Sequence, residues 1–141
     1  CSIFVKYIDS QFIQLWFGST GFVGGNVNFD LINKTKNELN GATGSITDFG
    51  NGWSKITMTK ASTGGNTSVL AIVTVSSLSS SRFGNEVDGS VYIWGAQVEE
   101  QTQAETYAPT KGIPVTIDLF TENNYGTSQG GIIQKDVPRN L

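Results

Sequence analysis

Residues that could support chemistry are sparse in this chain, which has 141 residues and no histidine. Without histidine, catalysis by an imidazole base and zinc binding by imidazole ligands are excluded. A pair of carboxylates of the glycosidase type is the remaining catalytic option. Glu99 and Glu100 are adjacent in a predicted strand, so their side chains point to opposite faces and cannot flank one glycosidic bond. We therefore expect a protein without enzymatic activity.

One acidic loop has the oxygen-rich composition of a cation site. Asn85 and Asp88 belong to the sequence NEVDG, which places oxygen donors at alternate positions before a glycine. Calcium prefers such hard oxygen ligands, although the spacing does not match an EF-hand loop. Because Asp-Gly is also a common turn, we interpret the loop first as an ordinary turn. A calcium site is the alternative, and no other cofactor is expected.

Carbohydrate sites combine aromatic rings, which stack on the apolar faces of sugars, with amides that bond the sugar hydroxyls. Four such residues share one face of two consecutive predicted strands: Gln14, Trp16, Asn26 and Asn28. Antiparallel sheets tolerate a polar face in contact with water. We predict that this face is exposed to solvent, first as plain sheet surface and alternatively as a groove for a glycan.

Two other tryptophans have an apolar sequence context. Trp53 and Trp94 each lie in a predicted strand beside apolar neighbours. We expect both rings to pack between the sheets, with the indole N–H bonded internally. Replacing either residue with alanine would then leave a cavity and cost about 3–5 kcal/mol of stability.

The elements that must position these residues are β-strands. The chain has 17 glycines, 3 prolines and only 15 % charged residues, a composition typical of short strands joined by tight turns. Apolar and β-branched residues define seven predicted strands, at 2–8, 11–17, 26–33, 45–50, 53–59, 67–76 and 90–99. Residues 34–44 are predicted to be rich in turns, and Asp9-Ser10 to form a tight reversal. The pattern predicts an all-β fold, an antiparallel two-sheet β-sandwich.

Charge and hydropathy exclude two classes of partner. The net charge is −3, and lysines and arginines are scattered singly, so no basic stripe is available for nucleic acid. No apolar run approaches the ~20 residues that cross a bilayer, so we expect no membrane insertion. The lone cysteine, Cys1, cannot form a disulfide within the chain, and we interpret it as a small apolar side chain. A chain that starts at cysteine is expected to be a piece of a longer protein.

Three segments resemble one family of domains. The sequence VYIWGAQVEE at 91–100, followed by TYAPT at 106–110, resembles a segment of the jelly-roll, concanavalin-like domains of bacteriophage tail-fibre and related virion proteins. NGWSKITMT at 51–59 and SIFVK at 2–6 resemble two further strands of these domains, in the same order. The resemblance implies a jelly roll over residues 1–112 in a virion protein. It also implies that strands which usually precede SIFVK are missing from this chain.

The last part of the chain has a different composition. Residues 113–120 are predicted to form one more strand, and residues 121–131 are polar and rich in glycine. We therefore place 113–141 outside the sandwich, as a C-terminal strand and a linker towards a following domain or repeat. The strand is expected to pair with a neighbouring chain or with the missing N-terminal strands. Fibre proteins of this resemblance are commonly trimers, which implies a homotrimer.

These inferences favour one function and leave two alternatives. The favoured function is a non-enzymatic tail-fibre or head-fibre module of a virion that binds a host surface glycan and contacts other virion proteins. The first alternative is a purely structural spacer or capsid-decorating module. The second is a carbohydrate-binding module appended to a secreted polysaccharide-active enzyme.

Overall fold

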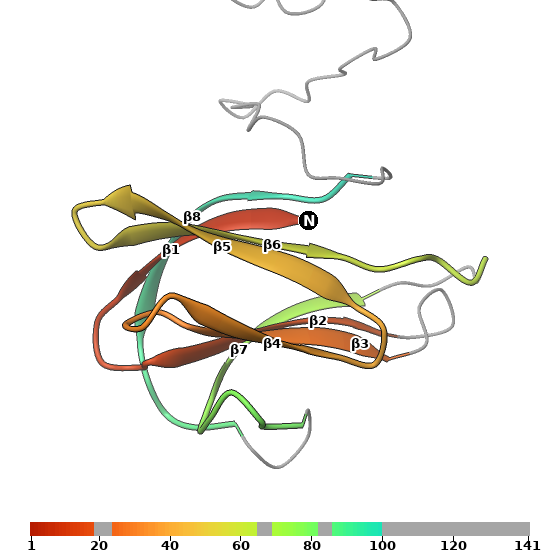
Figure 1. Cartoon of the computed structure of the whole chain (residues 1–141), viewed down its shortest axis with the longest axis horizontal. Helices are drawn as coiled ribbons and strands as arrows, with labels where there is room; N and C mark the ends of the chain where they lie inside the picture. The colour runs from red at the N-terminus through yellow and green to blue at the C-terminus, as the bar shows by residue number, and fades with distance from the viewer. Residues whose placement is uncertain (19–23, 65–68, 82–85, 100–141) are drawn as a thin grey trace, which may run out of the picture. The chain divides into compact units, whose positions relative to one another are not determined.

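The computed structural model of the chain is all-β in the residues it describes, which are 1–18, 24–64, 69–81 and 86–99 (Figure 1). The chain divides into two units, Cys1–Glu105 and Thr106–Leu141, and all described residues belong to the first. Eight strands form two antiparallel sheets of four strands each, which confirms the predicted two-sheet sandwich. The jelly-roll connection stays a prediction. The predicted boundary near residue 112 and the strand at 113–120 lie outside the described residues.

Each sheet combines a hairpin or meander with strands from elsewhere in the chain (Figure 1). Sheet A has the order β5 (Thr43–Gly50), β6 (Trp53–Thr59), β1 (Ser2–Tyr7), β8 (Val91–Gln97). Sheet B has the order β4 (Thr35–Leu39), β3 (Gly25–Asp30), β2 (Phe12–Gly18), β7 (Val69–Val75). Adjacent strands in sequence are therefore partners in β2–β3–β4 and in β5–β6, and the other connections cross between the sheets.

The core lies between the sheets and follows the period of two expected for strands. In β6, Ser54, Ile56 and Met58 are fully buried, while the residues between them are half-buried. Sheet A contributes Ile3, Val5, Ile56 and Met58, and sheet B contributes Ile13, Leu15, Phe17, Val27 and Phe29. Each fully buried large side chain of this kind stabilises the fold by roughly 1.5–3 kcal/mol relative to exposure.

The β5–β6 hairpin turns at Gly50-Asn51-Gly52, as the sequence predicts. These residues have φ values of 77°, 51° and 80°, a left-handed conformation that glycine and asparagine tolerate best. Just before the turn the register shifts, since Asp48 pairs with Ser54 but Gly50 pairs with Trp53. Phe49 is the extra residue of this bulge, and its side chain lies on the outer side of sheet A.

Two local predictions were wrong. Asp9-Ser10 does not reverse the chain between paired strands, because β1 belongs to sheet A and β2 to sheet B. Instead, the N–H groups of Asp9 and Ser10 both lie 3.3 Å from the carbonyl oxygen of Ser90, which ties this crossing to the start of β8. The apolar faces of both strands bury against each other only when the chain changes sheets, so the core decides against a hairpin.

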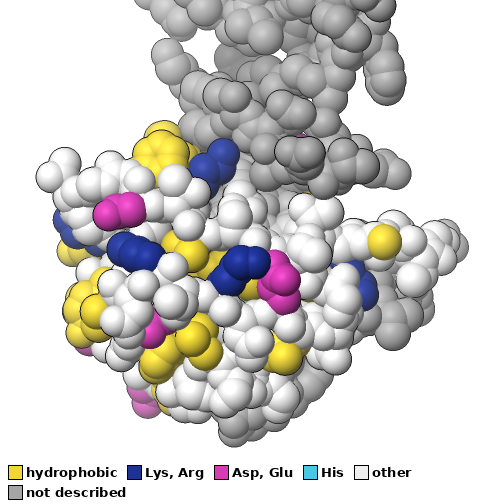
Figure 2. All heavy atoms as spheres, in the orientation of Figure 1, with side chains coloured by type: hydrophobic (Ala, Val, Ile, Leu, Met, Phe, Trp, Pro, Cys, Tyr) yellow, Lys and Arg dark blue, Asp and Glu magenta, His cyan; other side chains and the backbone are white. Residues whose placement is uncertain are grey.

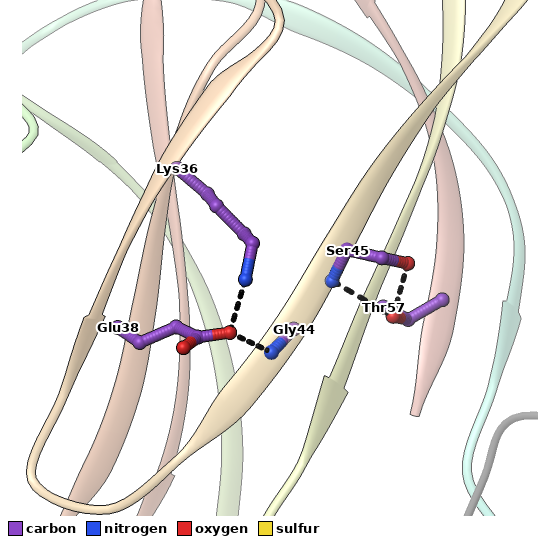
Figure 3. Close-up of polar contacts among 5 residues, drawn as sticks. All are labelled: Lys36, Glu38, Gly44, Ser45 and Thr57. Atoms are coloured by element: carbon purple, nitrogen blue, oxygen red, sulfur yellow. Dashed lines mark hydrogen bonds and ion pairs between the residues drawn. The ribbon is translucent and has the colours of Figure 1, made fainter.

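The second difference is β4, in the segment predicted to be rich in turns. Among the described strands, β4 pairs only with β3, at the edge of sheet B, and its residues are mostly exposed. Glu38 accepts a hydrogen bond from the Gly44 N–H at 2.8 Å and pairs with Lys36, linking β4 to β5 across the rim of the sandwich (Figure 3). These contacts hold the pKa of Glu38 below its ordinary value, chiefly through Lys36. A polar edge strand has no apolar period to detect.

Candidate functional site

The polar face predicted on β2 and β3 is not exposed to solvent. Gln14 and Asn28 are completely buried, and Asn26 is 2 % exposed. The side chains lie on the outer side of sheet B, but residues 76–81, which we call the strap, cross over them after β7. The prediction of a solvent-facing patch was therefore wrong, and these three amides are not accessible to a glycan in this structure.

The buried amides bind the backbone of the strap. Asn28 Nδ2 donates to the carbonyl oxygens of Leu78 and Ser80 at 2.8 and 2.7 Å. Gln14 Nε2 donates to Asn28 Oδ1 at 2.7 Å and to the Ser80 carbonyl at 3.3 Å. Asn26 Nδ2 lies 3.3 Å from Asn28 Oδ1. Buried carbonyls need donors, and these amides supply them, so the cluster has a structural role.

The fourth residue of the predicted patch is Trp16, which is half-buried. Its indole lies over Gly18, where a Cβ atom would come within 1.6 Å of ring atom Cη2. The ring thus occupies the space left by the missing side chain. The four residues share a sheet face, as predicted, but they do not form a common accessible surface.

The predicted calcium loop is only partly described. Asn85 lies outside the described residues, and Asp88 is exposed. Within the described ranges no three acidic, cysteine or histidine side chains come together in a group that could hold a metal ion.

The two tryptophans predicted to be in the core lie on the outer side of sheet A. Trp94 is 56 % exposed and pairs with Phe4, and Trp53 is half-buried and pairs with Lys6. Both predictions were wrong. Trp53 shares the parity of Lys55, which marks the outer face of β6, whereas β8 carries apolar residues on both faces and its pattern does not say which face is inner. In β6 the inner face belongs to Ser54, Ile56 and Met58.

An aromatic and basic surface results, which we call the aromatic face. Its members are Phe4, Lys6, Phe49, Trp53, Lys55, Tyr92 and Trp94. Six of them form two rows across the strands, Lys55–Phe4–Trp94 and Trp53–Lys6–Tyr92, and each row contains one lysine and two rings. On the side of the molecule seen in Figure 2, apolar, basic and acidic side chains are interspersed at the surface.

Phe4 is the centre of the first row. Its ring centroid lies 5.1 Å from those of Phe49, at an interplanar angle of 89°, and Trp94, at 52°. Lys55 Nζ lies 5.9 Å from the Phe4 centroid, within the range of a cation–π contact. Phe49 is 57 % exposed and Tyr92 58 % exposed. Several rings thus remain accessible although their edges pack against one another.

Hydroxyl groups continue this side of sheet A beyond the rings. Ser45 Oγ and Thr57 Oγ1 lie 2.7 Å apart on neighbouring strands, and the Ser45 N–H donates to Thr57 Oγ1 at 3.1 Å (Figure 3). Thr57 in turn pairs with Ser2 in β1. The sheet therefore offers stacking rings, ammonium donors and hydroxyl groups on one side, which is the chemistry that holds sugars by their faces and their hydroxyls.

Comparisons with family models, with curated proteins and with solved structures each found no match. Within the described part of the chain, no helix is long and apolar enough to cross a membrane.

A signal for the aromatic face was present in the sequence. Lys6 and Lys55 mark the outer parity of their strands, because lysine is almost never buried without a partner. Phe4 shares the parity of Lys6, and Trp53 that of Lys55, so these rings were assignable to the outer side. Trp94 was not, since β8 contains no charged residue between Val91 and Gln97.

Proposed function

We propose that this chain is a non-enzymatic glycan-binding module and that the aromatic face is its binding surface. The observation that carries the proposal is the exposure of Phe49, Tyr92 and Trp94, each more than half accessible on the same side of sheet A. Exposed aromatic clusters of this kind mark interaction sites, because leaving such rings in water is unfavourable. Sugar rings present apolar C–H faces that stack on them.

The form of the surface supports a polysaccharide as the ligand. The rings lie along an open sheet rather than inside a closed cavity, and the Ser45–Thr57 hydroxyl pair extends the same side. A linear glycan can lie along such a surface and bond at several sugars. Single contacts of this type are weak, so several copies of the module would increase avidity.

The sequence resemblance at 2–6, 51–59 and 91–100 supports a place for this module in a virion, as part of a tail or head fibre that attaches to a host surface glycan. A homotrimer would supply the multiple copies that weak sugar contacts need, with other virion proteins as neighbours.

A glycan array tests the proposal. Wild-type protein should bind a subset of polysaccharides, and Trp94→Ala and Tyr92→Ala should each weaken binding about tenfold or more. Ile32→Ala is the matched control, since Ile32 is a 53 % exposed apolar residue after β3, outside the aromatic face. Circular dichroism must show that every variant keeps its β signal. Equal binding by all variants would exclude the aromatic face as the site.

A structural module is the second candidate, and β8 gives it a specific observation. Ile93 in β8 is 54 % exposed, and Val98, directly after the strand, is 61 % exposed. Apolar side chains at a sheet edge are suited to contact with another protein. Absence of glycan binding, together with self-association that Trp94→Ala abolishes, would favour this function over the first.

A further inference from the structure

The aromatic face carries two lysines although the whole chain is acidic. The chain has a net charge of −3, but the outward side chains of β1 and β6 include Lys6 and Lys55. Lys6 pairs with Trp53, and Lys55 pairs with Phe4. Among the outward positions of the four described strands of sheet A there is no carboxylate. Asp48 pairs with Ser54, on the inner parity, and its carboxylate accepts the Gly50 N–H at 3.0 Å.

The acidic residue after β8 lies away from these lysines. Glu99 accepts a hydrogen bond from Gln97, and Gln97 pairs with Ser2, at the opposite end of β1 from Lys6. Lys6 itself pairs with Trp53 on one side and Tyr92 on the other. The ammonium group is therefore set between two aromatic positions. The nearest carboxylate along the chain is that of Asp9, three positions away, which accepts a hydrogen bond from the Ser90 N–H.

Lys6 differs from other lysines of the chain in its contacts. Lys34 Nζ donates to Ser54 Oγ at 2.7 Å, Lys60 Nζ donates to the Asn40 carbonyl at 2.7 Å, and Lys36 pairs with Glu38. Within the described part of the chain, the Lys6 ammonium makes no hydrogen bond or ion pair.

The stem of Lys6 is nevertheless positioned. It lies over Gly52, where an added Cβ atom would come within 3.2 Å of Lys6 Cε. The methylenes are thus packed against the β5–β6 turn, while the charge has no acceptor among the residues that the structure describes. This arrangement is suited to an anionic ligand.

We infer that the glycan bound by the aromatic face is acidic, with a sugar carboxylate or sulfate accepting hydrogen bonds from Lys6. This inference rests on the proposed glycan function. Lys55 adds a second positive charge in the neighbouring row, and the rings stack on adjacent sugars. A single-stranded nucleic acid also combines negative charge with stacking, but two lysines on a chain of net charge −3 provide few of the phosphate contacts that such binding needs.

The experiment uses the full chain and paired polysaccharides. Uronic-acid polymers are immobilised beside their carboxyl-reduced forms, sulfated polymers beside their desulfated forms, and a thymidine oligonucleotide is included. Wild-type protein should bind acidic members and lose about tenfold in affinity for their neutral counterparts. Lys6→Met should remove most of that difference, measured as the ratio of the affinities for the acidic and the neutral form of each polymer. Lys36→Met is the control, because it changes net charge equally at an exposed site on β4.

The outcomes separate the two levels of the proposal. Preference for uronic acids or for sulfated sugars identifies the anion, and either preference must depend on Lys6. Equal binding of acidic and neutral forms would overturn the acidic ligand and leave the glycan function standing. Binding to no polysaccharide would overturn both. Tighter binding to the oligonucleotide than to any glycan would assign the face to nucleic acid and refute the inference.

Discussion

The outer sides of the two sheets differ in composition and in exposure to solvent: polar side chains are buried on sheet B, and aromatic side chains are exposed on sheet A. On sheet B the outer side includes a cluster of amides, Gln14, Asn26 and Asn28, which are buried beneath the strap at 76–81. On sheet A the outer side carries aromatic rings, and Tyr92 and Trp94 are more than half exposed. Hydropathy alone would assign these environments the other way round.

The difference shows that a polar side chain can be buried when it donates hydrogen bonds to backbone carbonyl groups, although its polarity alone would predict exposure to solvent. The strap brings backbone carbonyls over sheet B, and a buried carbonyl without a donor costs free energy. Asn28 supplies two such bonds from one amide. Sheet A has no comparable cover in the described residues, and its rings pack against one another.

The strongest test of this comparison is removal of the central amide. Asn28→Ala should lower the free energy of unfolding by about 2–4 kcal/mol, because the Leu78 and Ser80 carbonyls and the Gln14 amide all lose a partner. Urea denaturation measures the change. Asn37→Ala is the control, since half-buried Asn37 makes one bond to the Leu78 carbonyl, at 3.0 Å, and should cost less. Equal, small losses would mean that the strap is not held by this cluster.

Asp30 lies in β3 on the same face as Asn28, and its carboxyl group makes the stability of this face depend on pH. Burial alone would raise the pKa of this carboxyl, but hydrogen bonds from Asn33, Gln11 and Ile32 outweigh it and lower the pKa. A lowered folded-state pKa contributes stability that is present above the unfolded value and is lost as pH falls through the folded one.

The corresponding variant is Asp30→Asn, which should cost about 1–2 kcal/mol at neutral pH. The loss of stability on acidification below about pH 4 should be smaller in the variant than in the wild type. Thermal unfolding at a series of pH values gives both quantities. Parallel pH profiles for the two proteins would show that Asp30 does not contribute to acid sensitivity.

On the aromatic face, ring removal should cost less than in the core. Trp94→Ala should lower stability by about 0.5–1.5 kcal/mol, the value of its ring pair with Phe4, because no closed cavity is left. Phe29→Ala, at a fully buried ring, serves as the reference and should cost about 3–5 kcal/mol. If both variants lost the same amount in denaturant titrations, Trp94 would have to be part of a packed interior.

The smallest effect is expected at the exposed hydroxyl pair. Thr57→Val removes the acceptor for the Ser45 N–H and the partner of Ser45 Oγ. Water replaces these bonds at an exposed site, so stability should change by no more than about 0.5 kcal/mol. The same titration measures it, with Ser45→Ala as the companion variant. A loss comparable to that of Asn28→Ala would remove the distinction between covered and open sheet faces.

Local sequence determined the strands and their turns. Alternation with period two predicted the two-sheet sandwich, and Gly50-Asn51-Gly52 predicted the β5–β6 turn, because few other residues accept three successive positive φ angles. Neighbouring residues control both features, so they can be predicted without a tertiary structure. Strand β4 could not, because an edge strand needs no apolar alternation.

Tertiary structure alone decided which face of each sheet is covered. Asn28 and Ser80 are separated by 52 positions, and no pattern around either residue announces their contact. Strand β8 carries apolar residues on both faces and no charged residue, so its outer face was decided by the pairing of Trp94 with Phe4. A strand's period sets which residues share a face, but whether that face meets water depends on what the rest of the chain places over it.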